Sequence, residues 1–386
     1  MKFPGIIQVI LFSCFFSHSY AQDSAIVNNL LYRLEQLQSK ESSVFPKGMF
    51  PSYRTYVLNK DQEKADVNAF YTGLICLTLR NLRPKLTISQ QVITDSIIAR
   101  AKPVYEKFKN RKGRPTYNFW PTDTVKIFPN SGLLNLFDKK QSLADDLDDT
   151  VIFLMALNVP DSIARYVHAL MQEYTINPRK RIKKNYEEYR KIPAYSTWFG
   201  KKMPVGFDIC VLSNVLYFVQ RYQLQWTAAD SASLRVIIKV INANKHLTDP
   251  SYVSPNYARS SVILYHLSRL MSLKSIAPLE ALKSKLIADA IKLLQHSADF
   301  IEQNILQTAL LRWGVKPPKI IFNTKKDLLE LTENANMPFF IANMGSVMPS
   351  PWDEWLGSSI GKFYYHCEAY NDLLLLENIL LNQGVE

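Results

Sequence analysis

The residues in this sequence best suited to chemistry are four aspartates within five positions: Asp145, Asp146, Asp148 and Asp149. The apolar run that follows, at 151–154, predicts that they lie near the start of a helix. At helical spacing Asp145, Asp148 and Asp149 share one face, while Asp146 and Asp149 are one turn apart. Because like charges at this range disfavour joint ionisation, either a cation neutralises the cluster or one carboxyl keeps its proton near neutral pH.

A carboxyl that keeps its proton can act as an acid catalyst. The segment from Asp146 to Asp149 reads Asp-Leu-Asp-Asp and resembles the Asp-x-Asp-Asp motif of class II terpene cyclases; Thr150 follows it, as in many plant diterpene members. This resemblance implies that Asp148 protonates an alkene of an isoprenoid-like substrate. It also implies that Asp146 and Asp149 support Asp148 through hydrogen bonds, and that the protonation step needs no metal or other cofactor.

A cation in the cluster is the second chemistry. Asp145, Asp146 and Asp149 fit the Asp-Asp-x-x-Asp motif of class I terpene and prenyl synthases, which implies magnesium bound beside a diphosphate. Hard oxygen ligands of this kind suit magnesium. The chain has no second Asn-x-x-x-Ser/Thr-x-x-x-Glu motif, so magnesium is expected only if this alternative holds.

The third interpretation is structural. Asp145 or Asp146 can cap a helix whose buried face starts at Leu147, and the positive end of the helix dipole favours the remaining acids. The same field stabilises a carboxylate, so a protonated Asp148 requires burial or a neighbouring charge that outweighs it.

The elements that must position these residues are helices of two kinds. Apolar helices that open with a polar cluster are expected to start near Asp66, Asp146, Asp208, Tyr257 and Phe363, the last running to Leu381. Amphipathic helices are expected over 23–38, 88–107, 161–174, 228–242 and 278–303. Because strand signals are scarce, the pattern predicts an all-α fold: an α/α toroid, or α/α barrel of helical hairpins, forming a single large domain over residues 22–386. A stacked α-solenoid is the alternative, and the toroid is the architecture of the terpene cyclase domains that the motif resembles.

In a toroid the starts of the inner helices face a common cavity, so their polar residues are candidates for binding a substrate. Aromatic side chains in the loops are further candidates, because their rings hold carbocations and also stack on sugars. Helix capping and ordinary packing are the structural alternatives for the same residues. The candidate substrate-binding residues are Asp145, Asp66, Asn68, Trp120, Trp198, Asp208 and His366.

Composition and the N-terminus limit the class of protein. Residues 1–21 have a lysine at position 2, an apolar run and Ser-Tyr-Ala before Gln22, a pattern typical of a secretory signal peptide. We therefore expect a secreted or periplasmic protein, cleaved near Ala21, without a transmembrane helix. The net charge of +12 suggests an anionic ligand or surface, although the basic run at 179–184 is more typical of a solvated loop than of a binding site for a diphosphate or an anionic polysaccharide. No nucleic-acid-binding motif is present, and Cys76, Cys210 and Cys367 are expected to be buried free thiols.

Three hypotheses follow for the function. The first is an exported toroid protein that resembles a class II terpene cyclase, with a small isoprenoid as substrate and Asp148 as general acid. The second is a glycan-active or glycan-binding α/α-barrel protein, because Asp353 and Glu354 stand between Trp352 and Trp355, a combination suited to gripping a sugar. The third is a non-catalytic helical scaffold. The sequence gives no indication of the oligomeric state.

Overall fold

The computed structural model describes residues 24–123, 144–175, 187–189, 191–199, 206–317, 328–333, 335, 337–343 and 362–383. The predicted signal peptide, the basic run at 179–184 and the stretch at 351–355 lie outside these residues. Among the described helices, none is both long and apolar enough to cross a lipid bilayer.

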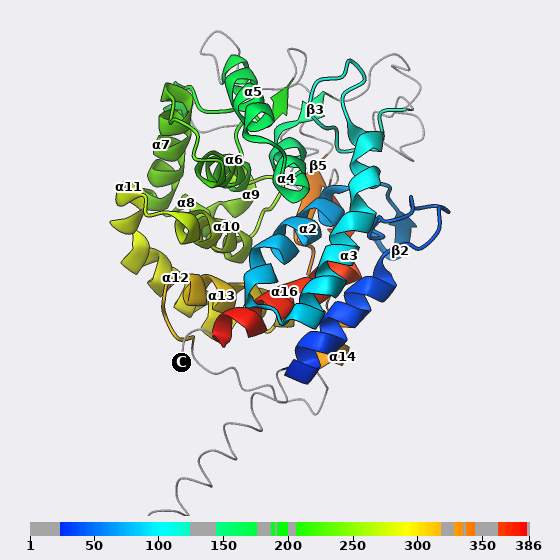
Figure 1. Ribbon diagram of the computed structural model, residues 1–386. Helices are drawn as coiled ribbons and strands as arrows, with labels where there is room; N and C mark the ends of the chain where they lie inside the picture. Colours follow the sequence, from blue (N-terminus) through cyan, green and yellow to red (C-terminus); the bar gives the residue numbers. More distant parts are fainter. Residues whose placement is uncertain are drawn as a thin grey trace, which may run out of the picture.

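Six helices are buried along most of their length: α2 (Phe70–Leu82), α4 (Leu147–Leu157), α6 (Ile209–Arg221), α10 (Ser260–Leu273), α13 (Phe300–Arg312) and α16 (Glu368–Asn382). Their sequences are apolar on nearly every side, which requires neighbours all round. Helix α2 packs against α4, and the contacts continue from α4 to α6, α10, α13 and α16 before returning from α16 to α2. The six helices thus form a closed circuit of contacts, which occupies the middle of Figure 1.

The amphipathic helices α3 (Ile88–Tyr105), α5 (Asp161–Met171), α7 (Ala228–Asn242) and α12 (Lys283–His296) lie around this circuit (Figure 1). Each buries one stripe; in α5, for example, the stripe includes Ala164, Val167 and Met171. Capping boxes start two of them, with Thr87 and Gln90 at α3 and Thr227 and Asp230 at α7. A further helix spans residues 24–37, and the short helices are α8 (Lys245–Thr248), α9 (Pro250–Val253), α11 (Ala277–Glu280) and α14 (Leu328–Glu333).

Two small antiparallel sheets accompany the helices. The larger has the order β2 (Asn59–Ala65), β1 (Tyr53–Tyr56), β6 (Lys362–His366) and β5 (Phe340–Asn343). The smaller pairs β3 (Asp145–Asp146) with β4 (Trp198–Phe199). The prediction of a mainly helical chain is therefore confirmed, whereas the expectation of an all-α fold is wrong because these strands are present.

Two predicted helix boundaries are also wrong. The expected helix from Phe363 begins only at Glu368, because residues 362–366 pair with both β1 and β5 as a strand. The expected helix over 278–303 is divided: α12 ends at His296, and Asp299 caps a separate inner helix, α13, by accepting a hydrogen bond from the Glu302 amide.

Candidate active site

The first turns of the inner helices lie together at one end of the circuit. Tyr257, which precedes α10, contacts Phe70 of α2 and the carboxyl of Asp148 of α4. At α16, Tyr370 packs its ring 5.3 Å from the ring of Tyr71 of α2. The starts of α2, α4 and α16 and the residue before α10 are therefore joined by these contacts.

Asp146 is the N-cap of α4. Its Oδ1 accepts hydrogen bonds from the backbone N–H groups of Asp148 at 2.7 Å and Asp149 at 3.1 Å, as the capping interpretation predicts. Backbone bonds on both sides hold it: its own N–H donates to Tyr117, and the Leu147 N–H donates to Thr197. The start of α4 is thus fixed by two separate loops.

Asp148 points into the interior and is buried, with 5% of its surface exposed. One oxygen accepts a 2.7 Å hydrogen bond from Asn214 Nδ2 of α6, and the other accepts one from the Tyr257 hydroxyl. Arg269 of α10 in turn donates to the Asn214 side-chain oxygen. These partners, rather than the flanking aspartates, hold the Asp148 carboxyl in place among the described residues.

Burial raises the pKa of Asp148, although the hydrogen bonds from Tyr257 and Asn214 and the charge of Arg269 act in the opposite direction. The pKa of Asp149 is also raised, by burial and by the charges of Asp146 and Asp148. Burial, followed by the charge of Asp148, raises the pKa of Asp146. Because the acids oppose one another's ionisation, the cluster retains protons where isolated aspartates would have lost them.

Asp208 lies close enough to this cluster for its charge to act on Asp146. It caps α6 through the N–H groups of Cys210 and Val211, and it also accepts hydrogen bonds from Ser254 Oγ at 2.5 Å and the Asn256 N–H at 2.9 Å. Burial raises its pKa to about 7. Since Ser254 and Asn256 immediately precede Tyr257, Asp208 positions the loop that brings Tyr257 to Asp148.

Asp145 points elsewhere. Its Oδ2 accepts hydrogen bonds from Asn110 and Thr116, both at 2.5 Å, and lies 3.4 Å from a guanidinium nitrogen of Arg114. It is in strand β3, where neighbouring side chains point to opposite faces. Asp145 of the class I motif therefore has partners that Asp146 does not share, and the described residues contain no group of three or more His, Cys, Asp or Glu side chains placed to hold a metal ion.

Asp66, Asn68 and Trp120 form a separate buried network before α2. The Trp120 indole N–H and Asn68 Nδ2 each donate to Asp66 Oδ1 at 3.0 Å, and Arg54 forms an ion pair with Asp66 Oδ2 at 3.3 Å. These residues therefore hold the loops over α2.

Trp198 and His366 also have structural partners. Trp198 pairs through its backbone with Asp146 in the smaller sheet. His366 is in strand β6 rather than in a helix, and its Nε2 lies 3.3 Å from the Thr55 hydroxyl. Burial lowers the pKa of His366.

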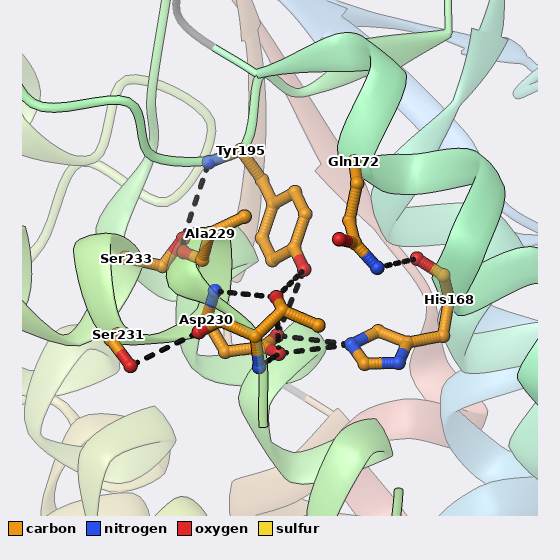
Figure 2. Close-up of polar contacts among 8 residues, drawn as sticks. His168, Gln172, Tyr195, Ala229, Asp230, Ser231 and Ser233 are labelled. Atoms are coloured by element: carbon orange, nitrogen blue, oxygen red, sulfur yellow. Dashed lines mark hydrogen bonds and ion pairs between the residues drawn. The ribbon is translucent and has the colours of Figure 1, made fainter. Parts of the chain in front are cut away.

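The loop that carries Trp198 is anchored between two outer helices (Figure 2). His168 Nε2 of α5 lies 3.0 Å from Asp230 Oδ2 of α7, and the Tyr195 hydroxyl donates to Asp230 Oδ1 at 2.9 Å. The Tyr195 N–H also donates to Ser233 Oγ. Because β4 follows this anchor directly, the network supports the strand that pairs with Asp146.

Aromatic rings fill the region next to Tyr257. Phe339 and Phe340 lie with ring centroids 6.0 and 5.8 Å from that of Tyr257, and Phe340 also contacts Phe119 and Tyr365. Beyond Phe339 is a cavity of about 390 Å³ between β1, β6 and the first turn of α16, and His366 is in its lining. The rings next to Tyr257 come largely from residues that sequence analysis did not select.

Comparison of the chain with protein-family models, curated proteins and solved structures gives no match. The functional argument therefore rests on the geometry of the chain itself. Sequence analysis missed Asn214 and Arg269 as site residues. Both could have been recognised from the sequence, because each is a polar residue within an otherwise apolar helix, which indicates a buried hydrogen-bond partner.

Proposed function

We propose that this chain is an acid–base enzyme of the α/α-toroid type that cyclises a small isoprenoid, with Asp148 as its general acid. The observation that carries the proposal is the position of the Asp148 carboxyl: it is buried at the start of an inner helix, between Tyr257 and Asn214, beside three other aspartates. Capping of α4 does not explain the buried position of the Asp148 carboxyl, because Asp146 already caps this helix.

The toroid assignment belongs to the same proposal. The closed circuit of contacts from α2 to α16 supplies the inner layer, and α3, α5, α7 and α12 supply the outer layer. In such an arrangement the shared end of the inner helices is the natural place for a site, because side chains from α2, α4, α6 and α10 are in contact there.

In the proposed reaction Asp148 transfers its proton to one carbon of an alkene. The π electrons form the new C–H bond and leave a carbocation on the other carbon, which a second double bond of the same substrate attacks. Loss of a proton from the final cation to a basic group completes an isomerisation with no net change in atoms. Asp148 shares a hydrogen bond with the Tyr257 hydroxyl, which gives a path for restoring its proton, and the rings of Phe70, Phe339 and Phe340 provide π faces for the cation.

The test is incubation of the purified protein with linear polyprenyl substrates of several chain lengths, followed by mass spectrometry. We expect a cyclised isomer from the wild type, and we expect Asp148→Asn to lower the rate by a factor of about 10² to 10⁴. The matched control is Asp299→Asn, which alters the cap of inner helix α13 outside the acidic cluster and should keep the rate. Folded wild-type protein that yields no cyclised product from any chain length would contradict the proposal.

Two further arms separate the alternatives. Activity should persist in EDTA, because Asp145 is held by Asn110 and Thr116 rather than beside Asp146 and Asp149; loss in EDTA with recovery in magnesium would favour the class I chemistry. Release of reducing sugar from a polysaccharide panel, abolished by Asp148→Asn, would instead assign the carboxyl to glycan chemistry.

A further inference from the structure

Phe339 separates the 390 Å³ cavity from the acidic site. Phe339 is part of the cavity lining, which combines aromatic and apolar residues such as Tyr53, Tyr71 and Met337 with three glutamates, Glu63, Glu333 and Glu368. The Phe339 ring centroid lies 4.9 Å from that of Tyr370, 5.6 Å from His266, 5.8 Å from Tyr265 and 6.0 Å from Tyr257. Since Tyr257 donates to Asp148, a single aromatic side chain and this tyrosine stand between the cavity and the proposed acid.

Three buried polar atoms surround this position without a hydrogen-bond partner among the described residues. They are His266 Nε2, Tyr370 Oη and Arg269 Nη1, on residues that are each at least nine-tenths buried. His266 and Tyr370 both pack against Phe339, and the Arg269 guanidinium lies 5.7 Å from the ring centroid of Tyr265, which itself contacts Phe339 and His266. Buried polar groups are nearly always hydrogen-bonded, so three unpaired atoms in one region call for a specific reason.

The donor and acceptor pattern of the three atoms indicates what they would bind. His266 Nδ1 lies 2.8 Å from the Val262 carbonyl oxygen, so Nδ1 carries the proton and Nε2 is the acceptor in the neutral ring. The guanidinium of Arg269 can only donate, and a tyrosine hydroxyl can do either. An alcohol satisfies this set, because its O–H donates to His266 Nε2 while its oxygen accepts from Arg269 or Tyr370.

We propose that the cavity and the space occupied by Phe339 form one binding site for an open-chain lipid alcohol, whose chain lies along the aromatic lining and whose hydroxyl binds His266, Arg269 and Tyr370. The inference rests on the proposed function in that it identifies this alcohol as the substrate presented to Asp148. Binding requires the Phe339 ring to move aside. The chain of the alcohol then takes over its contacts with Tyr257 and Tyr265.

The experiment measures binding by calorimetry with two probes, farnesol and farnesene, which share a carbon chain and differ in the hydroxyl. We expect Tyr370→Phe to weaken farnesol binding about three- to tenfold, the worth of one hydrogen bond, and to leave farnesene binding unchanged. The control is Tyr222→Phe. Tyr222 follows the last residue of α6, at the end away from Asp208, and its hydroxyl donates to the Leu154 carbonyl of α4. This variant should bind both probes as the wild type does. Phe339→Ala should tighten binding of both probes about tenfold, because the ring no longer has to be displaced.

Phe339→Leu is the second variant if Phe339→Ala fails to fold, and thermal melts of all variants identify such a failure. Equal loss of both probes in Tyr370→Phe, no gain in either Phe339 variant, or no binding of farnesol to any folded variant would each overturn the inference. Farnesol binding with the expected variant pattern but no cyclised product from any substrate would remove the proposed function and leave this site standing. Cyclised product, together with probe binding that the Phe339 and Tyr370 variants do not change, would support the proposed function and overturn this binding site.

Discussion

An acid that donates a proton near neutral pH needs surroundings that oppose ionisation, and Asp148 experiences forces in both directions. Burial raises its pKa, whereas two hydrogen-bond donors and the start of α4 favour the charged form. The charge of Asp148 in turn raises the pKa values of Asp146 and Asp149, because like charges disfavour joint ionisation. Proton storage at this site is therefore a property of the cluster.

Stability measurements distinguish a catalytic Asp148 from a capping aspartate. Asp146→Ala should lower the free energy of unfolding by about 0.5–2 kcal/mol, because two backbone N–H groups lose their acceptor. Asp148→Asn should leave it unchanged or raise it, because the amide can still accept from Asn214 and donate to Tyr257 while it removes a buried acid. Denaturant unfolding of both variants provides the comparison. A greater loss for Asp148→Asn than for Asp146→Ala would identify Asp148 as a structural group.

At this scale the sequence predicted the place of the acids better than their directions. The position of the aspartates at a helix start, and the nearness of Asp208 and Tyr257, followed from the pattern of apolar helices. The divergence of Asp145 did not, because it depends on a two-residue strand whose partner at 198–199 is distant in the sequence. Asn214 and Arg269 were missed because their bonds to the site span 66 and 55 positions.

At the scale of elements, tertiary contacts determine secondary structure that the local sequence pattern does not predict. The stretch before α16 continues the apolar character of that helix, yet it is a strand because β1 and β5 flank it. Helix α13 was merged with α12 because its polar residues, among them Gln303 and Asn304, blur the apolar signal although both are buried. The other inner helices were placed correctly because their apolar runs are long and begin with polar residues.

Close packing of α2 against α4 depends on Gly73. A Cβ built on this residue would lie 2.6 Å from a Phe153 ring carbon and 2.9 Å from an Ile152 methyl. We therefore expect Gly73→Ala to lower the free energy of unfolding by about 1–3 kcal/mol, since these core side chains have little room to move. The comparison is Gly206→Ala, where a Cβ meets nothing within 4 Å. Equal melting temperatures for the two variants would show that the α2–α4 contact is looser than the structure indicates.

At the scale of the whole molecule, the raised aspartate pKa values link folding to pH. An aspartate whose folded pKa exceeds its unfolded value of about 3.9 stabilises the fold at low pH, and this stabilisation is lost as pH rises through the folded pKa. Burial raises the pKa of Asp146 to about 8. Burial lowers the pKa values of His246, His266 and His366, so their opposing effect ends near pH 6.5, where unfolded histidine titrates.

The melting temperature should accordingly fall between pH 6.5 and pH 8. In Asp146→Asn, which keeps the cap but not the titrating group, the fall should be shallower. Melts of the wild type, Asp146→Asn and the control Asp299→Asn across this range measure the effect. A melting temperature that rises over the interval, or equal slopes in all three proteins, would contradict the raised pKa of Asp146.

Because the first and last inner helices contact each other, the circuit of inner helices can close only after α16 has been synthesised. The ring of Tyr71 of α2 lies 5.3 Å from that of Tyr370 of α16, and α16 packs against both α2 and α13. While the ribosome is still producing the chain, these two apolar helices have no partner on that side. Until the final helix emerges, a nascent chain in this state exposes the apolar faces of α2 and α13 to solvent. The protein is therefore expected to depend on holding factors during translation, and a premature stop before α16 should yield an aggregating product rather than a smaller working one.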